Sequence, residues 1–303
     1  MHLCKAGVTI PIMKYVVLLF YKYITIESPE AMRDSLKELG DKLGLTGRIL
    51  IAREGINATV EGADEKIELF VKEILSYECF ADIDIKRSEG TGSAFNKFKV
   101  KVRDEIVGTK FPKDIDPRNH TAPKLSPDEL RDWYENDKDF VVIDMRNDYE
   151  FISGHFKNSV NPGLKHSRDL AEKVKDLEPY KDKTVVTVCT GGIRCEKMAA
   201  YLEHEGFRNV HQLDGGMHTY MEKYPGKDFK GTLFTFDNRL TMDFGGEREI
   251  VGECHHCSEK TERYESCHRK PCHKKMLLCE GCFEEGKVFC TQECAEVGMV
   301  VKG

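Results

Sequence analysis

Residues 185–206 read VVTVCTGGIRCEKMAAYLEHEG, and the fold of the middle of the chain can be worked out from this segment. A run of β-branched residues ends at Cys189, and two glycines, an arginine and a second cysteine precede a helical stretch. This pattern is typical of a buried strand that passes through a short loop into a helix. In sheets of parallel strands covered by helices, active sites lie at the carboxyl ends of the strands. The sequence therefore predicts a functional loop that begins at Cys189.

The residues behind Cys189 are those that a stabilised thiolate needs. The start of a helix offers free backbone N–H groups and a positive dipole end. Gly191 and Gly192 let the loop curl so that these N–H groups point inward, and Arg194 adds a permanent charge. Together they lower the pKa of the thiol and make Cys189 a nucleophile. The alternative is a buried structural cysteine before an ordinary glycine turn; the order of strand, thiol, glycines, arginine and helix favours the reactive site.

Cys195 directly follows Arg194 and is expected to lie at the start of the helix. Two interpretations stay open for it. It resolves a persulfide or disulfide on Cys189, or it is a helix-start residue without chemistry, because closeness in sequence says little about the distance between two sulfurs.

The loop is predicted to belong to a parallel-sheet domain over residues 126–231. Ser126 is a good N-cap, Pro127 suits the first helical position and Glu129 completes a capping box. Three short apolar strands then alternate with helical stretches, at 140–145, 184–189 and 210–213. This alternation indicates a parallel sheet covered on both faces.

Residues 1–125 show a different order of elements. Strands are expected at 15–23, 47–52, 56–62 and 82–89, and helices at 29–43, opened by Ser28 as N-cap, and 63–75. The order βαββαβ predicts a ferredoxin-like, acylphosphatase-like α+β domain.

A further strand, KFKVKVR at 97–103, alternates cationic with apolar residues. Its cationic face consists of Lys97, Lys99, Lys101 and Arg103. We predict that this face binds RNA; the alternative is a solvated strand face, because alternating lysines are common on exposed sheet edges.

Eight of the twelve cysteines crowd into the tail, residues 232–303. They are Cys254, Cys257, Cys267, Cys272, Cys279, Cys282, Cys290 and Cys294. Two C-x2-C pairs have the spacing of zinc ligands, and metal would stabilise a segment with few apolar residues. We therefore predict structural zinc, at most two ions, rather than reduced structural cysteines or disulfides. Four histidines are possible substitute ligands, and the sequence leaves the pairing of ligands open: His255, His256, His268 and His273.

Composition limits the classes of function. The net charge of −6 provides no overall basic field, so a nucleic-acid site has to be a local patch. Charged residues interrupt the apolar start of the chain, so we expect neither a membrane span nor a secretory signal. We expect a cytoplasmic enzyme with reduced thiols. No flavin, haem or non-haem iron motif is evident, so no organic cofactor is expected.

The loop and its surroundings resemble rhodanese domains over about residues 126–225. Residues 143–161, IDMRNDYEFISGHFKNSVN, match the upstream signature of that family, and residues 213–220, LDGGMHTY, match its closing motif. The matching positions of the upstream signature are Asp144, Arg146, Glu150, Gly154, His155 and Asn161. The resemblance implies a persulfide-carrying Cys189. We interpret the two acidic residues and Arg146 as a structural ion pair that ties strand to helix. Four residues separate Cys189 from Arg194, one fewer than in Cys-x5-Arg phosphatases, which disfavours phosphate chemistry.

Nearly the whole chain, from about Met13, resembles the tRNA uridine hydroxylase family. The resemblance is carried by GRILIAREGINATVEG at 47–62, by CTGGIRCEK at 189–197 and by the cysteine-rich tail. It implies hydroxylation of C5 of the wobble uridine in the anticodon arm of tRNA, with molecular oxygen as co-substrate and Cys189 essential. Residues 1–12 fall outside the match and are interpreted as an extension, with Met13 as an alternative start. A sulfurtransferase that passes persulfide sulfur to an acceptor is the alternative, and a nucleic-acid-binding adaptor with an idle thiol is a third reading.

Overall fold

A computed structural model describes residues 14–112 and 115–300, and the chain divides into two compact units. The first unit comprises the described part of Met1–Lys22 together with Ile26–Arg103, and the second comprises Tyr23–Thr25 and Asp104–Gly303. The predicted extension at 1–12 and the alternative start at Met13 lie outside the described residues.

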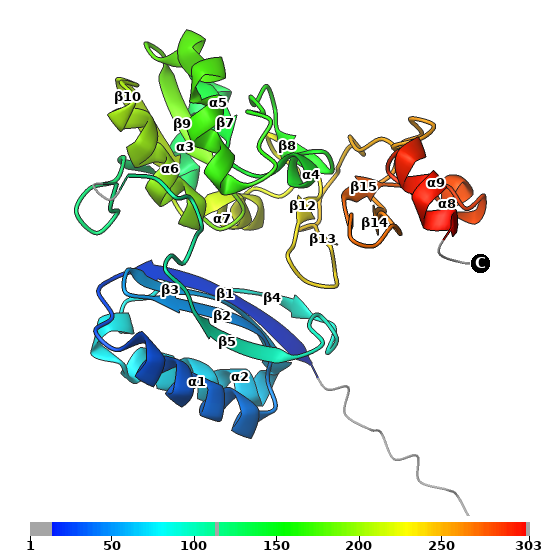
Figure 1. Cartoon of the computed structure of the whole chain (residues 1–303). Helices are drawn as coiled ribbons and strands as arrows, with labels where there is room; N and C mark the ends of the chain where they lie inside the picture. The colour runs from blue at the N-terminus through cyan, green and yellow to red at the C-terminus, as the bar shows by residue number, and fades with distance from the viewer. Residues whose placement is uncertain (1–13, 113–114, 301–303) are drawn as a thin grey trace, which may run out of the picture. The chain divides into compact units, whose positions relative to one another are not determined.

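The first unit is a sheet covered on one face by two helices (Figure 1). Its elements are β1 (Tyr15–Tyr23), α1 (Pro29–Leu43), β2 (Thr46–Ala52), β3 (Gly55–Ala63), α2 (Asp64–Ser76), β4 (Ile85–Gly90) and β5 (Phe98–Val102). The strands lie in the order β4-β1-β3-β2-β5. The predicted ferredoxin-like order is confirmed, and β5 adds a parallel edge strand beside β2. Ser28 stands at the N-cap of α1 as predicted, but its side chain makes no capping hydrogen bond.

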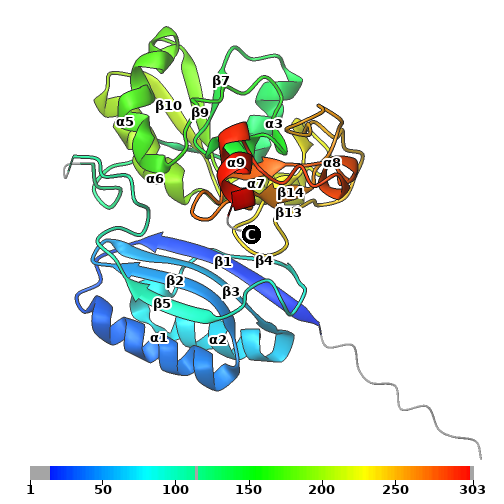
Figure 2. The same cartoon turned by 45° about the vertical axis from the view of Figure 1, so that its right-hand side comes forward.

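The second unit is built on a parallel sheet in the order β6-β10-β9-β7 (Figure 2). Its first elements are β6 (Lys124–Leu125), α3 (Pro127–Glu135), β7 (Val141–Asp144), α4 (Asp148–Phe151), β8 (Gly154–Phe156), α5 (Leu170–Lys173), β9 (Thr184–Val188), α6 (Ile193–His204), β10 (Asn209–Leu213), α7 (Gly216–Lys223) and β11 (Phe229–Gly231). Both faces of the sheet are covered, as predicted. Ile143 and Val185 pack with α5 and α6, whereas Val142 and Val186 pack with α3 and α7.

The start of α3 forms the predicted capping box. The Ser126 hydroxyl accepts a hydrogen bond from the Glu129 N–H at 3.2 Å, and the Glu129 carboxylate accepts one from the Ser126 N–H at 2.8 Å. Two otherwise unpaired N–H groups at the helix start are thereby satisfied.

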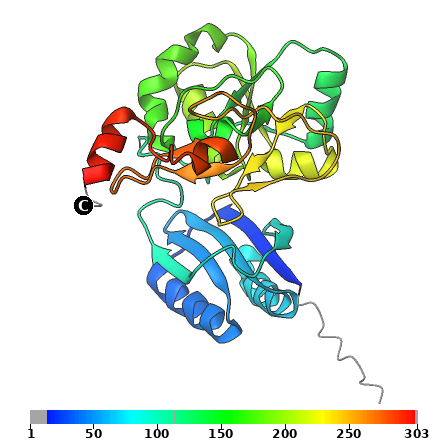
Figure 3. The same ribbon diagram turned by 90° about the vertical axis from the view of Figure 1, so that its right-hand side faces the viewer.

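The tail continues the second unit with short elements, coloured yellow to red in Figure 3. They are β12 (Leu233–Phe234), β13 (Thr241–Met242), β14 (Tyr264–Ser266), β15 (Lys275–Leu277), α8 (Glu280–Glu284) and α9 (Gln292–Val300). Tyr264 anchors the tail, because its ring packs on Phe234 and its hydroxyl donates to the Tyr149 carbonyl of α4. Within the described ranges, no helix combines the length and the apolar character that crossing a membrane requires.

Candidate active site

Cys189 is the first residue after β9, and its side chain is fully buried. The N–H of Gly192 donates a hydrogen bond to its sulfur at 3.2 Å, and α6 begins one residue later. Gly192 has φ 101°, a conformation that residues with a Cβ rarely adopt. The predicted curled loop is therefore present, with Gly192 as the donor and Gly191 buried beside it.

The surroundings of Cys189 favour its charged form. Burial by itself raises the pKa of the thiol, but a hydrogen bond from Cys195, the charge of Arg194 and the N–H groups of both residues outweigh burial and lower it to about 6. At neutral pH such a sulfur is mostly thiolate, which is the nucleophilic form.

Cys195 lies in the first turn of α6 and is fully buried as well. Burial, followed by the hydrogen bond to Cys189, raises its thiol pKa well above the ordinary value. The two thiols are thus a hydrogen-bonded pair, one acidic and one weakly acidic.

Arg194 is held by Glu150 in a buried two-bond ion pair. The guanidinium donates to the two carboxylate oxygens at 2.5 and 2.8 Å, and also to the Thr190 hydroxyl at 3.2 Å. Glu150 therefore does belong to a structural ion pair, but its partner is the loop arginine and not Arg146. A buried carboxylate can remain charged only beside a partner, and Arg194 is that partner.

Asp144 and Arg146 form the predicted structural pair. Both side chains are fully buried, and the guanidinium contacts the carboxylate at 2.7 to 3.1 Å. Arg146 also donates to the carbonyls of Glu150 and Gly154, at 3.2 and 2.7 Å, so that it ties the end of β7 to α4 and β8.

The closing motif at the start of α7 fixes the loop from the other side. The N–H groups of Met217 and His218 donate to the carbonyls of Cys189 and Thr190 at 2.9 and 3.0 Å. A Cβ on Gly216 would lie 2.6 Å from the Gly192 nitrogen, so only glycine fits. The resemblance pointed to this motif, but its contact with the thiol loop is visible only in the structure.

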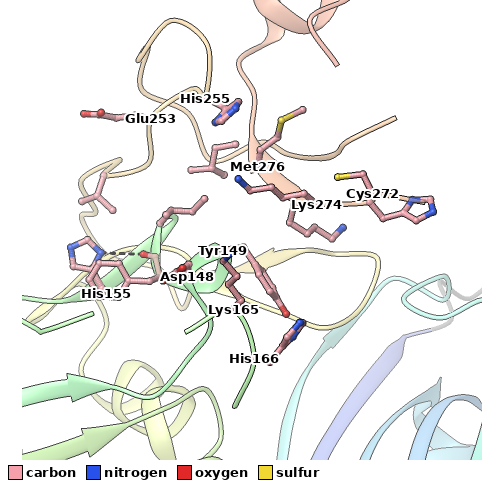
Figure 4. Close-up of a pocket in the computed structure, with 16 residues that line it drawn as sticks. Asp148, Tyr149, His155, Lys165, His166, Glu253, His255, Cys272, Lys274 and Met276 are labelled. Atoms are coloured by element: carbon pink, nitrogen blue, oxygen red, sulfur yellow. Dashed lines mark hydrogen bonds between the residues drawn. The ribbon is translucent and has the colours of Figure 1, made fainter. Parts of the chain in front are cut away.

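A cavity of about 990 Å³ lies beside α4, between the parallel-sheet part and the tail (Figure 4). Asp148 and Tyr149 line it next to Glu150, and three lysines contribute positive charge, namely Lys165, Lys274 and Lys275. Within the described ranges, none of these three lysines has a carboxylate within 4.0 Å.

The eight tail cysteines form two groups. One consists of Cys254, Cys257, Cys279 and Cys282, and the other of Cys267, Cys272, Cys290 and Cys294. Within each group all sulfurs lie within 4.8 Å of one another. The sulfur–sulfur distance is 3.5 Å for Cys257 and Cys279, 3.6 Å for Cys272 and Cys290, and 3.7 Å for Cys290 and Cys294. Four sulfurs at about 2.3 Å from a tetrahedral metal lie about 3.8 Å apart, so both groups fit one ion each. All eight thiols are free, and no histidine joins either group among the described residues.

The predicted cationic face of β5 is present in the first unit. Lys97, Lys99, Lys101 and Arg103 are all exposed, whereas Val100 is buried and the Phe98 ring packs against Gly40 of α1. Where the structure describes the chain, these three lysines form no ion pair. We call these four residues the stripe. Because its lysines have no acidic partner among the described residues, it gives the edge strand β5 a positively charged face.

Three family models match consecutive parts of the chain. An acylphosphatase-like domain of UPF0176 proteins matches residues 15–106, a rhodanese-like domain matches 126–223, and a rhodanese C-terminal domain matches 230–295. A solved rhodanese-related protein from Thermoplasma volcanium is 29% identical and covers 34% of this chain and 93% of its own, with a TM-score of 0.29.

Curated relatives match almost end to end. The tRNA uridine(34) hydroxylase of Staphylococcus carnosus is 41% identical over 94% of this chain and 90% of its own length. The enzyme of the same name from Staphylococcus haemolyticus is 39% identical with the same coverage. The chain belongs to the tRNA uridine(34) hydroxylase family.

Proposed function

We propose that this protein hydroxylates C5 of uridine 34 in tRNA with molecular oxygen, and that Cys189 is its reactive group. Membership of the tRNA uridine(34) hydroxylase family supports this activity. The observation that carries the role of Cys189 is its buried thiol, whose pKa is lowered to about 6 at the end of β9. Arg194 and the loop glycines, Gly191 and Gly192, hold the negative charge.

We assign Cys195 the role of second thiol. Hydroxylation by dioxygen places one oxygen atom in the base and reduces the other to water. This takes two electrons from a reductant in addition to the two from the C–H bond. Uridine, dioxygen, the Cys189 thiolate, the Cys195 thiol and one proton from solvent balance to 5-hydroxyuridine, water and one disulfide, so a Cys189–Cys195 pair supplies both electrons. The hydrogen bond between the two thiols supports this role. A cellular thiol would then reduce the disulfide by exchange.

The tRNA is proposed to bind through its anticodon arm. Bases in an RNA loop are already partly unstacked, so extruding one of them costs little. The uncompensated stripe of Lys97, Lys99, Lys101 and Arg103 suits a phosphate backbone. The three lysines of the cavity beside α4 supply a second positive surface near Glu150.

Zinc is proposed for the two cysteine groups of the tail. Thiolate ligands at tetrahedral spacing favour zinc in a reducing cytoplasm. The ions would stabilise the fold, since the core of the tail consists mainly of the cysteines with Met276 and Leu278.

The test is mass spectrometry of tRNA nucleosides from cells with and without the gene. We expect 5-hydroxyuridine at position 34 to disappear on deletion. The sulfurtransferase alternative, favoured by the rhodanese loop, predicts loss of a sulfur-containing nucleoside instead. Feeding heavy-isotope dioxygen separates the two, because only hydroxylation places the label in the base.

A further inference from the structure

Phe236 is an exposed aromatic side chain on the turn between β12 and β13. Its exposed fraction is 46%, and it is the only exposed residue among the Phe, Tyr and Trp side chains of the described ranges. A single exposed aliphatic side chain is ordinary. Every other Phe, Tyr and Trp side chain in the described ranges is less exposed, so the exposure of this ring calls for an explanation.

The turn that carries Phe236 is firmly held. The neighbouring side chains of Thr235 and Asp237 are buried. Asp237 accepts two hydrogen bonds from the Arg239 guanidinium at 2.8 and 2.7 Å, and the Thr235 N–H donates to the Leu240 carbonyl at 2.8 Å. The exposure of the ring is therefore set by a fixed backbone.

The Phe236 ring lies beside Arg194, in the first turn of α6 just after the loop that begins at Cys189. The Arg194 guanidinium carbon lies 5.7 Å from the ring centroid, within the range of a cation–π contact. Beneath the ring, Phe234 packs edge-on with a centroid separation of 5.3 Å. Arg194 also touches Thr190, the residue after Cys189. The exposed ring thus borders the loop that holds the reactive sulfur.

We propose that Phe236 is the platform on which the uracil base of uridine 34 stacks after it leaves the anticodon loop. An extruded base loses its stacking partners, and a protein aromatic ring replaces them without regard to hydrogen-bond pattern. The fixed turn holds the platform in place before the RNA arrives. This inference rests on the proposed function, because it takes uridine 34 as the substrate.

Binding of two RNAs to two proteins tests the inference. The RNAs are an anticodon stem-loop with uridine 34 and the same stem-loop with an abasic ribose at that position. The proteins are Cys189→Ser, which prevents turnover, and Cys189→Ser with Phe236→Ala. We expect Cys189→Ser to bind the uridine RNA about 5- to 150-fold more tightly than the abasic RNA, which is the range that loss of one stacked base gives. The variant that also carries Phe236→Ala should bind both RNAs with equal affinity.

Two further variants serve as controls. Phe236→Trp should keep the preference, since it keeps a stacking surface. Leu69→Ala removes an exposed apolar side chain of the first unit and should leave both affinities unchanged.

A preference that survives Phe236→Ala overturns the inference, and so does equal weakening of both RNAs, which would make the ring a backbone or structural contact. Activity separates this failure from failure of the proposed function. If the unmodified protein forms no 5-hydroxyuridine in tRNA, the function is wrong; if it forms it and Phe236→Ala forms it equally fast, only the role of Phe236 is wrong.

Discussion

The acidity of Cys189 leads to a quantitative prediction for its reaction with a small alkylating reagent. With a pKa of about 6, the thiol is about 90% ionised at pH 7, whereas a thiol at the ordinary value of 9.0 is about 1% ionised. The alkylation rate of Cys189 should therefore rise with pH to a half-maximum near pH 6. Cys195, whose pKa is raised, should stay unlabelled over the same range.

Removing the charge of Arg194 is the matching perturbation. Arg194→Gln alone would leave the Glu150 carboxylate buried without a partner, a change that costs about 3–5 kcal/mol. The double variant Arg194→Gln with Glu150→Gln removes both charges and leaves no buried carboxylate without a partner. In it, the half-maximum for Cys189 should move toward higher pH, and the rate at pH 7 should fall by at most about 90-fold, which is the ratio of the two ionised fractions.

The assay is site-resolved mass spectrometry of the Cys189 peptide after brief labelling with iodoacetamide, with circular dichroism to confirm folding. A half-maximum near pH 9 in the unmodified protein would refute the reasoning about the loop.

The lowered pKa of Cys189 also has a consequence for the stability of the fold. Because the folded pKa lies below the unfolded one, the ionised thiol stabilises the fold fully above pH 9, and this contribution is lost as the pH falls through about 6.

Three further predictions concern the tail, the stripe and the start of α3. Elemental analysis should find about two zinc ions per chain, and Cys279→Ala should lose one of them and make the tail sensitive to protease; a fully metal-free protein with a protected tail would contradict the zinc proposal. Lys99→Gln with Lys101→Gln should weaken tRNA binding and lower the slope of log affinity against log salt by about 1.5, whereas Lys37→Gln, whose lysine is paired on α1, should change neither. Equal slopes would leave the stripe as ordinary surface. Ser126→Ala should cost about 1 kcal/mol in the free energy of unfolding, and an unchanged denaturation midpoint would show that the capping box adds nothing.

Local signals made most of the fold predictable. The order of β-branched run, thiol, glycines and helix predicts a loop that begins at Cys189, and the capping residues predict where α3 starts. Alternation of lysines with apolar residues predicts which face of β5 is exposed. Each of these features depends only on residues a few positions apart. The regular repeat of helices and strands then fixes which of these side chains share a face.

Features that depend on distant segments were not predictable in this way. Glu150 and Arg194 are 44 positions apart, and nothing in their own neighbourhoods says that they pair. The cysteines of the tail interleave, since the C-x2-C pair that starts at Cys254 shares its site with the pair that starts at Cys279, across Cys267. Spacing identifies metal ligands, but only the path of the chain between them says which ligands meet.

The most direct test of the proposed chemistry uses the purified protein, tRNA, a thiol reductant and heavy-isotope dioxygen. We expect the unmodified protein to place the heavy oxygen in 5-hydroxyuridine at position 34, and folded Cys189→Ser protein to place none there, because a serine hydroxyl stays protonated in the same loop. Equal incorporation by the folded serine variant, or a product whose new atom is sulfur, would contradict the role assigned to Cys189.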